Sequence, residues 1–485
     1  MLIILNNLES HYEIEQLTRM FTKDLTVVHG TREDSISEET ADYLYVSKEE
    51  KVNICLEMGG RSWCGETAAD EDTDKMYLDI CAVIYNMYTE AFGRKMAWGM
   101  LTGVRPVRLM RNLYAKYKNV DEVCSLLQNR YFVSDEKIKL CRDIFSLQKN
   151  IIDSCSEKDY SLYISVPFCP TRCSYCSFVS VGSTGASKLM GQYVDKLCEE
   201  IRYTAKTAEK AGLNLKTIYI GGGTPTAVSA DQLRQIMQTV KDNFDLSKVL
   251  EYTVEAGRPD CTTKEKLQII KELGADRVSI NPQTFSDEVL RAIGRKHSHQ
   301  DFIDCYNMAK EIGFKTINTD LIAGLPLDTV EGFEKSLRGC IELGAENITV
   351  HTLTLKRASN IVVNQENNSY SDVAQMLEKC SMLAEKGYVP YYMYRQKSTL
   401  QSLENVGYSQ IGHENLYNIF IMEEIQTIIS CGAGGVTKVV GPCGELKRIY
   451  NYKYPAEYIN NFDTVLQRKD EVIDVCQQFG FLKDW

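Results

Sequence analysis

Short apolar runs alternate with longer amphipathic segments through the middle of the chain. The runs are rich in Val, Ile and Tyr and have the length of buried strands. They cover residues 162–166, 216–223, 250–256, 275–281, 315–324 and 346–353. The segments between them carry apolar residues at helical spacing, and several end in a glycine. They cover residues 193–212, 230–244, 263–274, 301–313 and 329–344.

This alternation predicts six βα units, which form a parallel sheet with right-handed crossovers. Six units are too few for a closed eightfold barrel, so we expect an open, partial (βα)6 TIM-like barrel in an α/β protein. In this architecture the ligand site lies at the carboxyl ends of the strands.

The pattern differs on both sides of the predicted barrel. Strand-like runs at 25–30, 42–47 and 51–58 precede helical segments at 76–92 and 137–153. We therefore expect an α+β N-terminal domain over 1–155, without a chemical motif, and a barrel over 156–388. Residues 389–485 are predicted to form a small α+β domain that covers the barrel mouth and contains a glycine-turned hairpin within 430–452.

Composition excludes several classes of function. The net charge of −11 argues against a general nucleic-acid binder, whose domains tend to be basic. No apolar run reaches the ~18 residues of a membrane span, and the first residues do not resemble a signal peptide. Seventeen cysteines without an export signal indicate reduced thiols. We therefore expect a cytoplasmic protein that binds neither nucleic acid nor a membrane.

Only one group of cysteines is clustered. Cys169, Cys173 and Cys176 directly follow the first predicted strand, so they belong at the barrel mouth. No fourth Cys or His lies at zinc-finger spacing, which argues against structural zinc. Three thiolates can hold a [4Fe–4S] cluster at three irons and leave the fourth open for a ligand. The spacing therefore favours a reactive iron–sulfur cluster.

Further candidate residues lie at later strand ends. Gly221, Gly222 and Gly223 follow the second strand, and Pro225 fixes the turn, so that backbone groups there can meet a ligand. Polar side chains that belong at the mouth are Glu255, Gln283, Arg295, His297 and Asp320. For Arg277 and Ser279 a structural role in the barrel is as plausible as a ligand contact.

Together these elements resemble the radical S-adenosylmethionine (SAM) enzymes, and within them the oxygen-independent coproporphyrinogen III oxidase (dehydrogenase) family. The motifs appear in order: Tyr163, "PFCPTRCSYCSF", "GGGTPT", "VEA", "RVSINPQ", "IGRKH" and "DLIAGLP". The N-terminal extension, with "KRAS", "YMYRQK" and "CGAGGVTK", looks most like the HemZ-type branch.

The resemblance implies a set of cofactor-binding residues. Cys169, Cys173 and Cys176 would hold the cluster, whose open iron is chelated by SAM. Tyr163, Tyr175, Gly222, Gly223, Thr224 and Glu255 would surround that SAM. Gln283, Arg295 and Asp320 match positions that contact a second SAM, so one or two SAM molecules would bind. No catalytic residue is expected beyond the cofactors.

The implied reaction is oxidative decarboxylation of substrate propionates to vinyl groups, started by a 5′-deoxyadenosyl radical. It would convert coproporphyrinogen III to protoporphyrinogen IX in oxygen-independent haem biosynthesis. The tetrapyrrole carries carboxylates that a local basic pocket would bind. Candidates for that pocket are Lys356, Arg357 and Arg395, with His351 and Lys397. The implied partner is an electron donor such as flavodoxin or ferredoxin, and the implied state is a monomer.

Two other functions fit the same motifs. One is a haem-binding chaperone of the same lineage, for which His351 and His413 are candidate axial ligands. The other is a radical SAM enzyme acting on haem or another substrate. Haem binding by the protein would favour the first of these, and turnover of a porphyrinogen would favour the oxidase.

Overall fold

The structure is a computed structural model, and the chain forms two compact units. It describes residues 1–22, 24–36, 42–178, 180–183, 186–354, 371–396, 403–442 and 444–481. The first unit comprises mainly residues 1–145 and the second mainly residues 146–485. The chain passes from one to the other within α6 (Asp135–Asp153).

The first unit is built on a five-stranded sheet with the order β2-β1-β3-β4-β5. Its strands are β1 (Leu2–Asn6), β2 (Thr26–His29), β3 (Tyr43–Lys48), β4 (Lys51–Met58) and β5 (Arg61–Ala68). Its helices are α1 (Tyr12–Phe21), α2 (Arg32–Ser35), α3 (Thr73–Phe92), α4 (Pro106–Tyr117) and α5 (Val120–Asn129). Alternate residues of β4 are buried in one core with α1 and α3, so one face of this sheet is covered by helices. The predicted strands are β2, β3 and β4, and the α+β character is confirmed.

The second unit contains the predicted partial barrel. Six parallel strands lie side by side in chain order within one larger sheet. They are β6 (Asp159–Val166), β9 (Asn214–Gly222), β10 (Glu251–Glu255), β11 (Arg277–Ser279), β12 (Thr316–Ala323) and β13 (Asn347–Thr352). The prediction of a (βα)6 barrel is confirmed.

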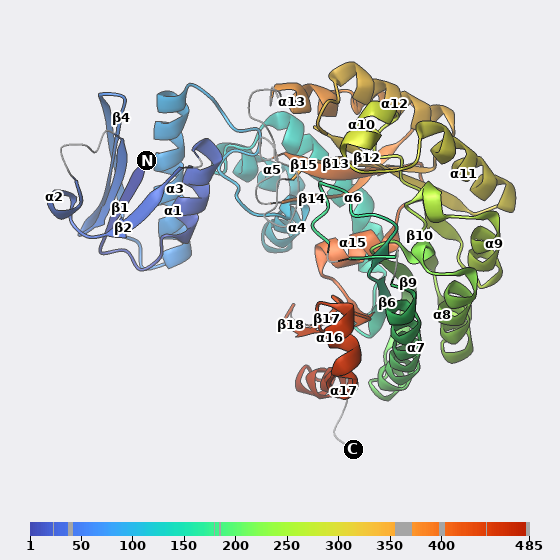
Figure 1. The fold of residues 1–485 in the computed structure, drawn as a ribbon. Helices are drawn as coiled ribbons and strands as arrows, with labels where there is room; N and C mark the ends of the chain where they lie inside the picture. Colours follow the sequence, from blue (N-terminus) through green and yellow to red (C-terminus); the bar gives the residue numbers. More distant parts are fainter. Residues whose placement is uncertain are drawn as a thin grey trace. The chain divides into compact units, whose positions relative to one another are not determined.

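Helices connect these strands along the outer side of the sheet (Figure 1). They are α7 (Ser187–Lys210), α8 (Ala230–Asn243), α9 (Lys264–Glu272), α10 (Asp287–Ala292), α11 (His299–Ile312) and α12 (Val330–Glu342). Local sequence sets their ends: Ser229 and Ser298 form capping boxes with Gln232 and Asp301, and Gly313 ends α11 in the left-handed conformation.

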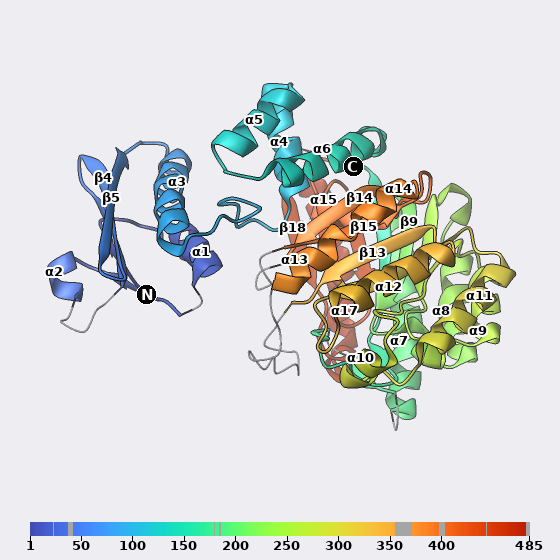
Figure 2. The ribbon, with the colours of Figure 1, turned by 90° about the horizontal axis from the view of Figure 1, so that it is seen from above.

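Residues 389–485 add strands to both edges of the same sheet. β15 (Glu404–Ser409) pairs antiparallel with β13, and β14 (Val389–Arg395) with β15, as Figure 2 shows. At the other edge β16 (Thr427–Cys431) pairs parallel with β6 and leads into β17 (Val436–Val440) and β18 (Leu446–Tyr450). β17 and β18 form the predicted hairpin. The remaining helices are α13 (Ser371–Glu378), α14 (Ser381–Glu385), α15 (Leu416–Glu423), α16 (Pro455–Asn460) and α17 (Phe462–Gln478).

The C-terminal segment reaches both ends of the barrel. The backbone N–H groups of Leu416 and Tyr417, at the start of α15, donate to Glu251 at the amino end of β10. At the carboxyl end of β6, Ser165 donates to the carbonyl of Ala433 at 2.8 Å. The boundary at 388/389 and a cover over the mouth stay predictions.

None of the described helices has the length and apolar character that crossing a bilayer requires.

Candidate functional site

The three clustered cysteines lie on the loop that follows β6. Cys169 ends the short strand β7 (Phe168–Cys169), which pairs with β8 (Val181–Gly182) beyond the cysteines. The N–H of Cys176 donates to the carbonyl of Cys173 at 3.1 Å, and Cys173 is only 8% exposed. All three thiols are free, and burial raises the pKa of Cys169 and of Cys176. The structure thus brings the predicted ligands together on one loop at the mouth.

Three free thiols on one loop suit a cubane cluster. Among the described residues, no three Cys, His, Asp or Glu side chains converge closely enough to hold one metal ion. A cubane binds each thiolate at a different iron, so its ligands need not converge on one point.

The glycines after β9 allow the chain to pass directly against this loop. Gly222 has φ +109°, and the N–H groups of Gly223 and Thr224 donate to Val166 and Phe168 at 3.0 and 2.7 Å. A Cβ at Gly223 would lie 2.6 Å from the Phe168 oxygen and 3.1 Å from Cys169 Sγ. Thr224 Oγ1 lies 3.5 Å from the same sulfur. Glycine is required here by the cysteine loop itself.

Three stacked tyrosines fill the inside of the barrel below the cysteines. The Tyr219 and Tyr417 rings are 4.5 Å apart, and Tyr163 stacks on both at about 6 Å. Tyr219 donates to Glu255 Oε1 at 2.6 Å. Sequence reasoning found Tyr163 and Glu255 but missed the other two rings. Tyr219 shares a strand face with Gly221, a signal that could have identified it, whereas Tyr417 comes from the distant α15.

Glu255 is an ionisable group at the end of β10 whose pKa is shifted. Burial raises its pKa to about 7, the Tyr219 hydroxyl opposes this shift and Asp320 adds to it. A protonated or easily protonated carboxyl at a strand end is typical of a site that binds a polar ligand.

Arg295 and Tyr175 come together beside the cysteine loop. Arg295 Nη1 donates to the carbonyls of Gly257 and Asn281. Its Nη2 donates to the Tyr175 hydroxyl at 3.1 Å. Its Nε is buried and has no hydrogen-bond partner among the described residues. A buried guanidinium with an unsatisfied donor suits a ligand carboxylate.

Gln283, in the segment after β11, lies beside Asp320 on β12. The Gln283 N–H donates to the Asp320 carbonyl at 2.9 Å, and Gln283 has φ +66°, a strained conformation for this residue. Asn318 Nδ2 donates to the Asp320 carboxylate, and His351 Nε2 lies 3.8 Å from it.

Two other candidates lie at opposite edges of the sheet, Arg277 at the amino ends of the barrel strands and Arg395 at the edge where β13 also ends. Arg277 is at the amino end of β11, away from the mouth, and donates to the His413 carbonyl at 2.9 Å. Arg395 ends β14 opposite Glu404 and is buried. Lys356, Arg357 and Lys397 lie outside the described residues.

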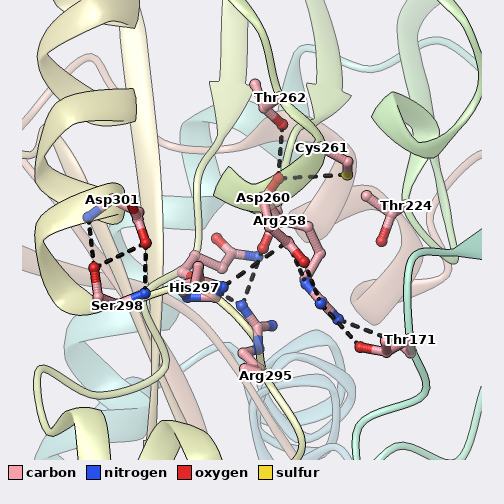
Figure 3. Close-up of polar contacts among 12 residues, drawn as sticks. Thr171, Thr224, Arg258, Asp260, Cys261, Thr262, Arg295, His297, Ser298 and Asp301 are labelled. Carbon is pink, nitrogen blue, oxygen red and sulfur yellow. Dashed lines mark hydrogen bonds and ion pairs between the residues drawn. The ribbon is translucent and has the colours of Figure 1, made fainter.

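Sequence reasoning also missed Arg258, whose buried side chain approaches the cysteine loop. Figure 3 shows it with Asp260, His297 and Arg295, next to Thr171.

Several known proteins are similar to this chain in sequence or in fold. A profile of the radical SAM superfamily matches residues 163–339. The chain is 34% identical over 478 residues to the oxygen-independent coproporphyrinogen-III oxidase-like protein HemZ of Bacillus subtilis, covering 96% of this chain and 95% of that protein. It is 40% identical over 201 residues to the heme chaperone HemW of B. subtilis, covering 40% of this chain and 51% of that protein. The structure of coproporphyrinogen III oxidase (HemN) from Escherichia coli superposes with a TM-score of 0.52 at 23% identity, covering 66% of this chain and 73% of that one.

Proposed function

Because the chain belongs to the radical SAM superfamily, in the family of HemZ, we propose that it oxidatively decarboxylates the propionates of coproporphyrinogen III to vinyl groups. The product would be protoporphyrinogen IX. The observation that carries this proposal is the similarity to an oxidase-like protein along 96% of the chain, with the cysteine loop and the buried polar groups in one barrel mouth.

Radical SAM proteins use a [4Fe–4S] cluster and SAM, and this chain does so as a member of that superfamily. When bound, the two together supply abstraction of a hydrogen atom from a substrate carbon. The free thiols, and the glycine path that brings Thr224 against Cys169, fit this pair.

The protein's own groups would bind and orient the two cofactors. Cys169, Cys173 and Cys176 would hold the cluster, and the chain at Gly222–Thr224 would meet SAM through its backbone. Arg295 has an unsatisfied donor for a carboxylate, and Glu255 can accept from an ammonium group once it is ionised. Gln283 and Asp320 are proposed contacts of a second SAM.

The stacked tyrosines would form the inner side of the site. Tyr163, Tyr219 and Tyr417 close the barrel interior, and Tyr219 holds Glu255 in place. A rigid floor of packed rings helps to hold the groups of a functional site in place.

The remaining parts of the proposal concern partners. We propose that basic side chains, including Arg395, bind the carboxylates of the tetrapyrrole. A donor such as flavodoxin or ferredoxin would supply the electron, and the protein would act as a cytoplasmic monomer.

A haem chaperone is the second candidate, because HemW is 40% identical over 201 residues. His413 Nδ1 contacts Thr316 at the amino end of β12. His351, on β13, lies beside Asp320, which is also on β12. Four residues of strand separate these two contacts by about 13 Å. The two histidines thus contact β12 at separate positions, which does not favour them as a pair of ligands to one haem iron.

The experiment that separates these functions is an anaerobic turnover assay. The protein is reconstituted with iron and sulfide, reduced, and mixed with SAM and coproporphyrinogen III. The oxidase proposal requires 5′-deoxyadenosine together with a porphyrinogen that has lost one or two carboxyl groups. Stable haem binding without loss of carboxyl groups would support the chaperone and overturn the oxidase.

A further inference from the structure

A buried guanidinium lies directly beside the cysteine loop. Arg258 follows β10 and is 3% exposed (Figure 3). Its Nε and Nη2 donate to the two carboxylate oxygens of Asp260 at 2.9 and 2.7 Å. The same side chain reaches Thr171, with Nη1 donating to its carbonyl at 3.2 Å and Nη2 to its hydroxyl at 3.0 Å.

The remaining donor of Arg258 points to a cluster cysteine. Nη1 lies 3.6 Å from Cys173 Sγ, within hydrogen-bond range for sulfur. A guanidinium has five N–H groups, and here each has an acceptor. This saturation fixes the side chain, so that one N–H is held toward the sulfur.

The turn that carries Arg258 is itself held rigidly. The Thr262 hydroxyl donates to the Arg258 carbonyl at 2.9 Å, and Lys266 Nζ donates to the carbonyl of Cys261 at 3.0 Å. Asp260 supplies a bidentate partner from two residues along the chain. The guanidinium is therefore presented by a preorganised turn, as expected for a group that orients a metal ligand.

We propose that Arg258 is a positioning residue that fixes Cys173 and makes the iron–sulfur cluster easier to reduce. The inference rests on the proposed function, since it needs the cluster at these cysteines. Adding an electron increases the negative charge on the cluster and its sulfur ligands. A hydrogen bond from a cation to one sulfur stabilises that reduced state, and so raises the reduction potential.

A redox titration of the reconstituted protein, followed by absorbance, tests this inference. Arg258→Met removes the donor and its charge, and we expect at least a tenfold loss in the equilibrium constant of reduction. For one electron this is a midpoint about 59 mV lower. Asp260→Asn removes a negative charge beside the guanidinium and keeps an amide oxygen that can accept from Arg258, so the midpoint of this variant should move in the opposite direction.

A matched control is Arg234→Met. Arg234 forms a similar fork with Glu272 at 3.1 Å, but on the outer side of α8 and α9. The midpoint potential of Arg234→Met should equal that of the wild type. Arg258→Lys, which keeps the charge without the fork, should fall between the wild type and Arg258→Met.

Several outcomes decide the matter. Wild-type midpoints for both Arg258 variants, or a downward shift for Asp260→Asn, would overturn the inference. If Arg258→Met folds by circular dichroism but holds less iron, positioning is supported, and Asp260→Asn and Arg258→Lys test the potential. A wild-type protein that binds no cluster would instead overturn the proposed function.

Discussion

At the scale of single residues, the described part of the chain places a fourth thiol close to the loop that carries the three proposed ligands. The fourth, Cys261, donates to the Arg258 carbonyl at 3.5 Å and contacts Thr226 Oγ1 at 3.6 Å. A radical SAM cluster needs an iron without a protein ligand. Comparing a variant of Cys261 with variants of Cys169, Cys173 and Cys176 therefore tests which thiols bind the cluster.

We predict that Cys169→Ser, Cys173→Ser and Cys176→Ser each lose the cluster. Cys261→Ser should keep it, because a hydroxyl can make the same two contacts. Iron content per chain and the visible absorbance of the anaerobically reconstituted proteins measure this. Loss of iron in Cys261→Ser equal to that in Cys169→Ser would contradict the assignment.

The raised pKa of Glu255 predicts a pH-dependent stability. Its carboxyl has a pKa of about 7 in the fold against 4.5 as the ordinary value, so the folded protein binds more protons between these limits. The stability that protonated Glu255 contributes is present at low pH and is lost as the pH rises through about 7.

Glu255→Gln removes this titration and keeps an acceptor for Tyr219. Between about pH 5 and about pH 8, the free energy of unfolding of the cofactor-free wild type should fall relative to the variant by about 2–3 kcal/mol. Denaturant unfolding at several pH values measures the difference. Tyr219→Phe, which removes the opposing hydrogen bond, should move the transition to higher pH. Parallel profiles for wild type and Glu255→Gln would show that Glu255 is not perturbed.

At the scale of elements, the C-terminal helix is tied to the first barrel helix by a buried ion pair. Lys469 Nζ on α17 lies 2.9 Å from Glu200 Oε1 on α7, and both side chains are almost fully buried. Glu200 also accepts from the Tyr458 hydroxyl and from the Gly432 N–H. Breaking one partner of such a pair leaves an uncompensated charge in the interior.

We therefore predict that Lys469→Met destabilises the protein by about 3 kcal/mol. The double variant Lys469→Met/Glu200→Gln should recover most of that loss, because it removes the orphaned charge. Arg338→Met, which breaks an exposed pair with Glu334 on α12, should cost less than about 1 kcal/mol. Urea unfolding followed by circular dichroism tests all three. Equal losses in the free energy of unfolding for Lys469→Met and Arg338→Met would contradict a buried ion pair at Lys469.

The barrel strands could be predicted from the sequence because a buried strand is a short apolar run, and this pattern does not depend on which elements pack against it. It placed the cysteines and Glu255 at the mouth because parallel strands end at one edge. It could not find Arg258, since "GRPD" reads as a solvated turn and its partner Thr171 lies 87 positions away. Nor could it show that β16 pairs in parallel with β6, because local pattern does not encode the neighbours of a strand.

At the scale of the whole molecule, the similarity to HemZ extends beyond the barrel to the first unit. The HemW of B. subtilis aligns over only 40% of the chain. The first unit is thus a feature that this chain shares with the oxidase-like protein HemZ.

The most direct test of the account follows the hydrogen that leaves the substrate. Coproporphyrinogen III carrying deuterium at the β-carbons of its propionates is turned over anaerobically with SAM by the reduced, reconstituted protein. The account predicts that 5′-deoxyadenosine gains deuterium as the porphyrinogen loses carbon dioxide, both by mass spectrometry. Unlabelled 5′-deoxyadenosine with an intact porphyrinogen would contradict it.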